Sequence, residues 1–509
     1  MALKTKAHHQ SSNHSSVATS IKTLKLNLSV FKYSTWLDEN QLRRTGPWIA
    51  VGIAVLLRWA VSLGPYSGMA SPPRFGDYEA QRHWMELTLH RPVREWYSDS
   101  SKWWDLDYPP LTAYVSLICA YIGNMISPEW FAWKSSRGYE SIEAKLYMRS
   151  TVLFLELAVY FTSIFAFTAR WFSKQNWTHQ HTALVLILIQ PGIILIDSGH
   201  FQYNTVMLGL VVWSVNCFLD DQDVLGSVFF CLALGFKQMA LYFSPAVFAY
   251  LLGKSIRQGF FGCIWKLIKL GSTVILTLGL LFAPWSHTLP DILQVLHRIF
   301  PVFRGLYQDK VANVWCAVNV VVKLREMFDI KQLVRFSTAT TMLAFLPSTV
   351  MLLARPTKRS LLYGMVNTSL SFFLLSFQVH EKSILIPALP ITLLILDEPA
   401  VGSLFITSAT FSMFPLLRQE GLVTPYLVLM GLWIWLTAGA FKGTPTLLSG
   451  FAIANIFIIF SMHMAEFLIP LPLAKYPDIY SVLNALWNAA CFVVFWIYYN
   501  HRQYRQYCQ

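Results

Sequence analysis

Two carboxylates in one polar stretch are the strongest candidates for chemistry in this sequence. The stretch from Gly64 to Pro110 is crowded with Asp, Glu, Arg and Trp, although the rest of the chain is largely apolar. Asp77 follows Gly76, a residue type that lets the backbone bend freely. A carboxylate fixed beside a substrate can remove a proton from an attacking hydroxyl. Asp107 has two interpretations, because it can serve chemistry or cap the helix that follows it.

The composition predicts an all-α polytopic membrane protein. Of the 509 residues, 55% are hydrophobic and only 13% are charged, whereas a soluble protein carries about a quarter charged residues. Apolar runs of about 18 residues recur along most of the chain, as helical membrane spans require, and the alternating segments of a membrane barrel are absent. The net charge of +13 comes from Lys and Arg in short connections. Such residues orient spans, so nucleic acid is not a predicted partner.

Neither the cysteines nor the acidic turns predict a metal site. The seven cysteines are scattered, mostly inside apolar segments, and have no zinc or disulfide spacing. Asp220, Asp221 and Asp223 form a short acidic turn that we interpret as a solvated cytosolic face. We therefore expect no metal and no other cofactor.

The basic residues of the N-terminal segment set the predicted orientation. Residues 1–46 are polar, basic and rich in Ser and His, which predicts a disordered cytosolic tail without a cleavable signal. A first span at about 48–63 then brings the loop 64–149 to the lumenal side.

The main open question of topology is whether the apolar segment 111–126 crosses the membrane. If it crosses, the polar stretch 197–204 lies on the cytosolic side; if it lies along or re-enters the membrane, that stretch is lumenal. The second alternative places Arg170 and Lys174 in the cytosol and fits the later loops. Its cost is that the sequon at Asn176 becomes cytosolic and unused.

The complete topology has about fourteen spans with both termini in the cytosol. We expect four parts: the tail 1–46, a transmembrane module 47–284 that includes the loop 64–149, a second lumenal loop 285–336 with an interfacial helix at about 311–322, and a C-terminal transmembrane module 337–509.

This topology gathers ionisable groups on the lumenal face. Such groups are costly at membrane depth and normally pair or line a watery cavity. Several cations can hold a phosphate leaving group while a carboxylate takes a proton, so the set suits a phosphate-bearing substrate. The set comprises Asp77, Glu79, Arg82, Asp107, His200, Gln202, Lys237, Arg298, Arg304, Asp309, Lys310, His380, Glu381 and Lys382.

Simpler interpretations exist for several of these residues and their neighbours. His380 lies beside Glu381 and Lys382, where an ion-pair cluster is the alternative to phosphate binding. Arg58, inside the first span, is expected to pair structurally or to extend toward the interface. The tryptophans of the first loop are expected to anchor the chain at the interface. They are Trp84, Trp96, Trp103 and Trp104.

Six segments carry a resemblance to a known family. They are residues 64–68 (GPYSG), 76–86 (GDYEAQRHWME), 106–110 (LDYPP), 199–204 (GHFQYN), 236–240 (FKQMA) and 377–382 (FQVHEK). These segments resemble the endoplasmic-reticulum glucosyltransferases of N-glycan precursor assembly, over about residues 57–397. The run 79–84 is similar to the enzymes that add the first glucose. The resemblance implies a GT-C fold with large lumenal loops in the endoplasmic-reticulum membrane.

The same resemblance implies substrates and roles. The donor would be dolichyl-phosphate-glucose, and the acceptor the lipid-linked Man9GlcNAc2, glucosylated with inversion in α-1,3 linkage without a metal. Asp77 matches the general base, and inversion needs only one such base. His380, Lys382 and Arg298 would hold the donor phosphate. Relatives usually have an acidic residue where this chain has Gln308, which shifts weight to Asp77 and Asp107 as catalytic residues.

Three alternatives remain open at this point. Within the class, the chain can be the second-glucose transferase or another dolichyl-phosphate-sugar-dependent enzyme. A transporter or lipid scramblase is the alternative from another class, but transporters show repeated halves with ionisable groups near the midplane. Here the ionisable groups lie in the loops and no halves repeat. A catalytically inactive assembly subunit is the third alternative.

Overall fold

The computed structural model describes residues 27–99, 103–300, 311–469 and 476–509. Within these ranges the chain forms helices joined by turns and contains no strands, which confirms the all-α prediction. Seven helical segments of the described chain are long and apolar enough to cross a membrane. They are α5–α6 (Ile142–Trp171), α7–η4 (Trp177–Phe201), η5–α11 (Gln238–Ile256), α12–η6 (Gly259–Trp285), α16 (Ile330–Ala354), α22 (Thr446–Leu468) and α23 (Ile479–Cys508).

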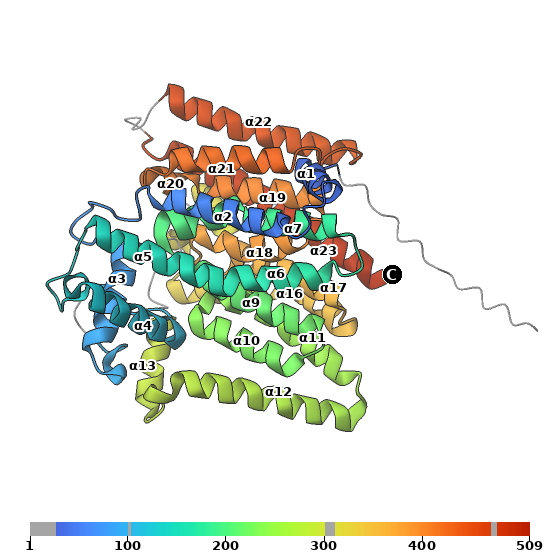
Figure 1. Ribbon diagram of the computed structural model, residues 1–509. Helices are drawn as coiled ribbons and strands as arrows, with labels where there is room; N and C mark the ends of the chain where they lie inside the picture. Colours follow the sequence, from blue (N-terminus) through green and yellow to red (C-terminus); the bar gives the residue numbers. More distant parts are fainter. Residues whose placement is uncertain (1–26, 100–102, 301–310, 470–475) are drawn as a thin grey trace, which may run out of the picture.

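Shorter apolar helices complete a bundle whose helices run roughly side by side (Figure 1). They include α2 (Gly46–Ser62), α9 (Asn204–Leu219), α10 (Asp223–Phe236) and α21 (Val423–Leu436). A further short apolar helix, α4 (Pro110–Ile126), lies at one end of this bundle (Figure 1). The polytopic fold is thus confirmed, and the total of about fourteen spans stays a prediction.

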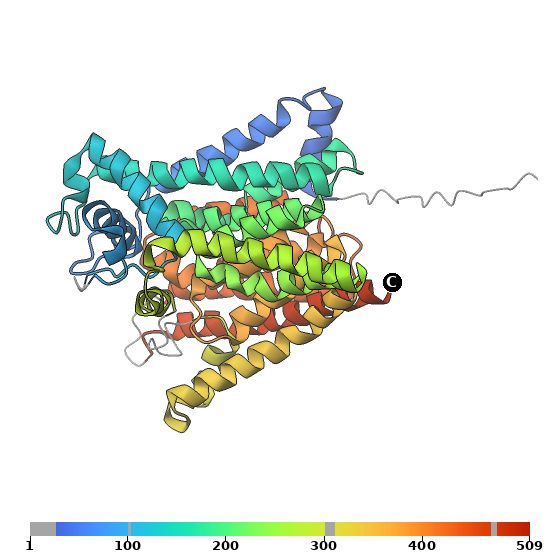
Figure 2. The same cartoon turned by 90° about the horizontal axis from the view of Figure 1, so that it is seen from below.

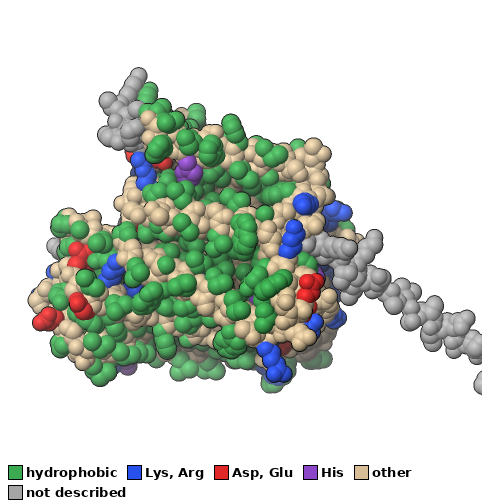
Figure 3. Space-filling view, turned by 45° about the horizontal axis from the view of Figure 1, so that its top comes forward, with side chains coloured by type: hydrophobic (Ala, Val, Ile, Leu, Met, Phe, Trp, Pro, Cys, Tyr) green, Lys and Arg blue, Asp and Glu red, His purple; other side chains and the backbone are tan. Residues whose placement is uncertain are grey.

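The bundle has buried central helices and lipid-facing outer ones. Almost every side chain of α17 (Lys358–Leu375), α18 (Leu385–Leu393) and α19 (Pro399–Ser412) is buried. The outer helices α12, α16 and α22 instead expose large apolar side chains, as a lipid environment permits. In Figure 3 hydrophobic side chains cover the middle of the visible face, and the charged ones lie mainly toward its two ends. This is the surface expected of a membrane bundle.

The helices α3 (Asp77–His90), α4 and α13 (Leu289–Ile299) lie together at one end of the bundle (Figures 1 and 2). We call them, with their connecting segments, the end lobe. The lobe has a small apolar core of its own, to which the predicted interfacial anchors Trp84 and Trp96 belong. Those two predictions were wrong, because burial of a large aromatic ring against neighbouring apolar residues is the stronger driving force. The other core residues include Leu87, Tyr97, Leu106, Trp285, Val295 and Ile299.

The position of α4 bears on the open question of topology. This helix packs on α3 and against the adjacent ends of α10 and α12. Tyr114 Oη donates to the carbonyl of Leu281 at 2.9 Å, and Thr112 Oγ1 donates to the carbonyl of Phe236. Both acceptors lie at helix ends that face the end lobe. The placement favours the interpretation in which 111–126 belongs to the loop and does not cross.

The C-terminal part of the predicted disordered tail, residues 1–46, contains an ordered helix. Helix α1 (Ser29–Glu39) packs against α7 and α21, with Val30, Ser34 and Leu37 buried. These three positions form one helical face, a pattern that the polar composition of the segment conceals. Ser34 Oγ also lies 2.8 Å from His181 Nδ1. Residues 1–26 lie outside the described residues.

The second predicted loop, 285–336, contains more helix than expected. The predicted interfacial helix corresponds to α14 (Val314–Val321), which begins where the side chain of Asn313 accepts from the backbone N–H of Cys316. Helix α16 then begins at Ile330, because Asp329 and Gln332 form a reciprocal capping box. The boundaries of the four predicted parts remain predictions.

The opposite end of the bundle holds the C-terminus and α1 (Figure 1). At this end lies the acidic turn predicted to be a solvated face, and two of its carboxylates form ion pairs with lysines. Asp221 contacts Lys254 at 2.9 Å and Lys358 at 2.8 Å, and Asp223 contacts Lys254 at 2.7 Å and Lys266 at 2.6 Å. The described residues contain no group of three or more His, Cys, Asp or Glu arranged to hold a metal ion.

Candidate active site

A tight loop places Asp77 in the first turn of α3. Gly76 precedes the helix, and the backbone N–H of Asp77 donates to Ser67 Oγ at 3.2 Å. A Cβ atom at position 76 would lie 2.6 Å from Ser67 Oγ, so only glycine lets the loop close here. The N-terminus of a helix carries a partial positive charge, which favours a carboxylate at this position.

Residues distant in sequence converge on Asp77. Its Oδ2 atom lies 2.9 Å from His200 Nε2, 2.5 Å from Gln202 Nε2 and 2.5 Å from Lys382 Nζ. His200 and Gln202 come from the end of η4 (Ile194–Phe201), and Lys382 from η7 (Glu381–Ile384). The side chains of Asp77 and Lys382 remain 30% and 22% exposed. The sequence-predicted residues therefore form an open cluster.

Lys237 adds a second cation to this cluster. Its Nζ atom donates to Asn204 Oδ1 at 2.7 Å and to Gln202 Oε1 at 3.2 Å, and lies 4.7 Å from the ring centroid of Tyr108. Gln202 thus links Lys237 to Asp77. We call Asp77, His200, Gln202, Lys237 and Lys382 the Asp77 cluster.

The charges in the Asp77 cluster shift the pKa values of its members. Burial opposes ionisation of Asp77, but the positive charge of Lys382 and the hydrogen bond from His200 hold the pKa of its carboxyl well below the usual range. Burial, together with the charge of Lys382, lowers the pKa of Lys237 to about 8. At neutral pH Asp77 is therefore an ionised carboxylate, and Lys237 remains cationic.

Asp107 lies beside this cluster on the segment that leads into α4. Its negative charge acts on both Lys237 and Tyr108. Gln238 Nε2 donates to the carbonyl of Asp107 at 3.3 Å and to that of Ile299 at 3.2 Å, which joins the segment to α13. A catalytic role for Asp107 stays a prediction.

The structure adds one residue that sequence reasoning missed. Glu420 follows α20 (Phe414–Gln419), and its Oε1 and Oε2 atoms lie 2.6 Å and 2.7 Å from His200 Nδ1. The available signal was a carboxylate in a short turn between two apolar segments.

The backbone around His200 is fixed from two sides. Arg149 Nη2 donates to the carbonyl of Gly199 at 2.6 Å and to that of Pro65 at 3.1 Å. The backbone N–H of Ser67 donates to the carbonyl of His200 at 3.0 Å. The loop that carries Asp77 and the end of η4 are thus tied together, and His200 is held facing Asp77.

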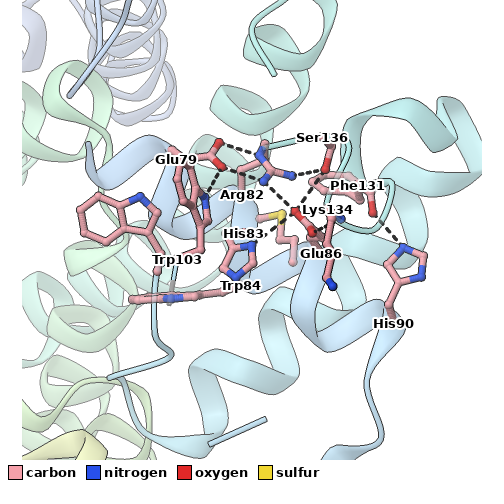
Figure 4. Close-up of polar contacts among 12 residues, drawn as sticks. Glu79, Arg82, His83, Trp84, Glu86, His90, Trp103, Phe131, Lys134 and Ser136 are labelled. Carbon is pink, nitrogen blue, oxygen red and sulfur yellow. Dashed lines mark hydrogen bonds and ion pairs between the residues drawn. The ribbon is translucent and has the colours of Figure 1, made fainter. Parts of the chain in front are cut away.

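Glu79 and Arg82 belong to a different, closed group (Figure 4). Arg82 donates to Glu79 at 2.7 and 2.8 Å, to Glu86 at 2.8 Å and to Ser136 Oγ at 2.6 Å. Trp103 Nε1 donates to Glu79 at 2.9 Å. We call Glu79, Arg82, Glu86 and Ser136 the Arg82 network. It lies inside the end lobe, and binding of substrate by Glu79 or Arg82 stays a prediction.

Arg298 is also engaged in the end lobe. It donates to the carbonyls of Tyr97 at 3.2 Å and Asp99 at 3.0 Å, and it pairs with Asp105. These contacts fasten α13 to the first loop, and phosphate binding by Arg298 stays a prediction.

The remaining predicted residues fall into two groups. His380 and Glu381 are half-buried at the start of η7, directly before Lys382. Arg304, Asp309 and Lys310, with the departure at Gln308, lie outside the described residues.

An ionised carboxylate beside a histidine and two lysines, at the end of a helical membrane bundle, suits group transfer from a phosphate-linked donor. This defines the class as membrane-bound transferases. Residues 54–499 match the model of the ALG6, ALG8 glycosyltransferase family. The chain belongs to this family and is a glycosyltransferase.

Three relatives align over most of the chain. A probable dolichyl pyrophosphate Man9GlcNAc2 alpha-1,3-glucosyltransferase of Schizosaccharomyces pombe is 43% identical over 454 residues, 87% of this chain and 89% of that protein. The enzyme of that name from Gallus gallus is 46% identical over 386 residues, 75% and 76% of the two chains. The one from Saccharomyces cerevisiae is 42% identical over 503 residues, 91% of each. The family resemblance predicted from the sequence is thereby confirmed.

Proposed function

We propose that this enzyme transfers the first glucose from dolichyl-phosphate-glucose to lipid-linked Man9GlcNAc2, in α-1,3 linkage. The names of the three relatives supply the acceptor and the linkage. The observation that carries the proposal to this chain is the convergence of His200 Nε2 and Lys382 Nζ on Asp77 Oδ2. A base and a phosphate-binding cation are thereby adjacent, as transfer from a sugar phosphate requires.

In this proposal Asp77 is the general base. It accepts the proton of the acceptor's 3-hydroxyl as that oxygen attacks C1 of the glucose. The bond between C1 and the phosphate oxygen breaks, and dolichyl phosphate leaves as an anion. A single displacement inverts the anomeric centre and needs one carboxylate.

The cations hold the departing phosphate. Lys382, which contacts Asp77, and Lys237, which Gln202 links to Asp77, provide positive charge beside the base. We assign His380, two residues before Lys382, to the same phosphate. Charge-assisted hydrogen bonds to phosphate are about twice as strong as neutral ones. The phosphate is stable as an anion, so the reaction needs neither a second acid nor, in our proposal, a metal ion.

We assign the end lobe to the lumen of the endoplasmic reticulum and both termini to the cytosol. The C-terminus and α1 lie at the end of the bundle away from α3 and α4 (Figure 1). Lysines of the connections gather at that end, where they contact Asp221 and Asp223. Basic connections are typical of the cytosolic side.

The test uses purified protein, dolichyl-phosphate-glucose and two lipid-linked acceptors, Man9GlcNAc2 and Glc1Man9GlcNAc2. Glycan mass is followed with and without a chelator. We expect one hexose added to the first acceptor only, at a rate the chelator does not change. Transfer to the second acceptor alone would indicate the second-glucose enzyme, and loss of transfer with chelator would overturn the metal-free mechanism. No transfer to either acceptor would contradict the proposed function.

A further inference from the structure

We propose that Glu420 is a positioning residue for the catalytic base, acting through His200 on Asp77. The three side chains would then work as one unit, Glu420–His200–Asp77, although they lie far apart in the sequence. The inference rests on the proposed function of Asp77 and adds a residue to that site.

The geometry of the three side chains is that of a bridge. The imidazole of His200 contacts Asp77 through Nε2 at 2.9 Å and Glu420 through Nδ1 at 2.6 and 2.7 Å. The exposed fraction falls from 30% at Asp77 to 10% at Glu420 and 2% at His200. The open end of the bridge is therefore Asp77, where a substrate can enter. The inner partners are held away from solvent.

Glu420 decides which nitrogen of His200 faces the base. A carboxylate accepts hydrogen bonds only, so Nδ1 must carry its proton where it contacts Glu420. With Nδ1 protonated, Nε2 donates to Asp77 when the ring is cationic and doubly protonated, and it accepts from Lys382 Nζ, which lies 2.9 Å away, when the ring is neutral. Carboxylates commonly fix the tautomer and the ring orientation of a functional histidine in this way. Without Glu420, the ring loses the contact that holds Nε2 toward Asp77.

The charged groups around Asp77 determine what loss of this contact does. Lys382 and Lys237 face Asp77 together with His200, and Arg149 faces Glu420. The hydrogen bond from His200 helps to hold the pKa of Asp77 low. If His200 turns away, the pKa of Asp77 rises. A base must be deprotonated to act, so the acid limb of the rate profile then moves to higher pH.

The test compares Glu420→Gln and Glu420→Asp with wild type between about pH 5 and pH 8, the range in which proteins are generally most stable. We expect Glu420→Gln to lower kcat by about 10-fold to 100-fold. It should leave the KM for the donor unchanged and move the acid limb of the rate profile to higher pH than in wild type. Glu420→Asp keeps the negative charge and should restore part of kcat.

A matched control is a carboxylate that pairs with a residue close to Glu420 in sequence. Arg418 of α20 pairs with Glu466 of α22, a contact that does not involve His200. Glu466→Gln should therefore keep the kcat and the pH profile of wild type. Thermal unfolding of each variant separates misfolding from an altered site, and Glu420→Asp keeps the test informative if Glu420→Gln does not fold.

A second readout does not depend on the substrates. In protein labelled with ¹⁵N-histidine, with His200→Asn as the assignment control, the Nδ1 signal of His200 should be that of a protonated nitrogen. Glu420→Gln should change that signal. Wild-type kcat and profile in Glu420→Gln, or an unchanged Nδ1 signal, would overturn this inference while leaving the proposed function intact. Absence of transfer by wild type itself would instead count against the proposed function.

Discussion

The Asp77 cluster and the Arg82 network begin on the same helix, α3, and use the same kinds of residue, yet they are built differently. The partners of Asp77 come from η4 and η7, far away in the sequence. Arg82 finds two of its carboxylate partners, Glu79 and Glu86, within α3 itself. Asp77 is 30% exposed, whereas Arg82 is 2% exposed.

This difference in burial and in the origin of the partners distinguishes a candidate binding site from a structural ion-pair network. In the Arg82 network several acceptors bind the guanidinium of Arg82, so few of its N–H groups remain to bind a ligand (Figure 4). In the Asp77 cluster the carboxylate of Asp77 stays 30% exposed beside Lys382, so a ligand can reach both groups. Residue types alone do not distinguish the two; the origin and burial of the partners do.

The largest expected effect is on catalysis, from Asp77→Asn. Asparagine has nearly the same shape but cannot accept the proton, so transfer should fall by about 10³-fold. Binding of dolichyl-phosphate-glucose should persist, because the cations remain. Steady-state transfer and equilibrium donor binding, measured on the same preparation, check this. Turnover within tenfold of wild type would remove Asp77 from the role of base.

The matching change in the Arg82 network should affect stability instead. Arg82→Ala leaves Glu79 and Glu86 without their buried cation, which costs about 3–5 kcal/mol. Thermal unfolding should shift strongly downward, while the protein that remains folded keeps the donor KM of wild type. An unchanged unfolding temperature with abolished transfer would contradict the comparison and move the network into the site.

Lys382→Ala should produce an intermediate effect on donor use. Loss of a charge-assisted hydrogen bond of about 1.5–3 kcal/mol corresponds to roughly a 10-fold to 100-fold rise in the donor KM. Because Lys382 also lowers the pKa of Asp77, the acid limb of the variant's rate profile should lie at higher pH than that of wild type. Initial rates over a range of donor concentrations and pH measure both effects. A donor KM equal to that of wild type would exclude phosphate binding by Lys382.

The smallest effect is a pH dependence set by Lys237. Its pKa is lowered to about 8 by burial and by Lys382, so it is cationic below that pH and neutral above it. The donor KM of wild type should therefore rise as the pH passes through about 8. Lys237→Gln should show at every pH the higher KM that wild type reaches at alkaline pH. A wild-type KM that stays constant across this range would argue against a phosphate contact from Lys237.

Much of the candidate site could be predicted from sequence because the membrane topology alone brings its residues to the same side. His200, Gln202, Lys237 and Lys382 each lie at or shortly after the end of an apolar segment, and Asp77 lies in the loop after the first span, all on the same predicted side. Hydropathy and basic connections suffice to place such ends together. Their mutual contacts at 2.5 to 3.2 Å then required only the packing of the bundle.

The remainder depended on side-chain direction, which sequence does not determine. Glu420 lies in a turn without any charge run, and only the packing of α20 brings it to His200. Arg82 and Arg298 carry the charge that a phosphate site needs, yet partners within the end lobe occupy them. Trp84 resembled an interfacial anchor, but it belongs to the apolar core of the lobe.

The most direct test of the account concerns stereochemistry. In the proposed reaction a single base and a single displacement invert the anomeric centre, so a donor with β-linked glucose, as the family resemblance implies, gives an α-linked product. The anomeric configuration of the transferred glucose, determined by NMR or by digestion with α- and β-specific glucosidases, reports this outcome. The account predicts only α-linked glucose. A β-linked product would require a covalent intermediate or a second nucleophile, and would contradict the assignment of Asp77 as the sole base.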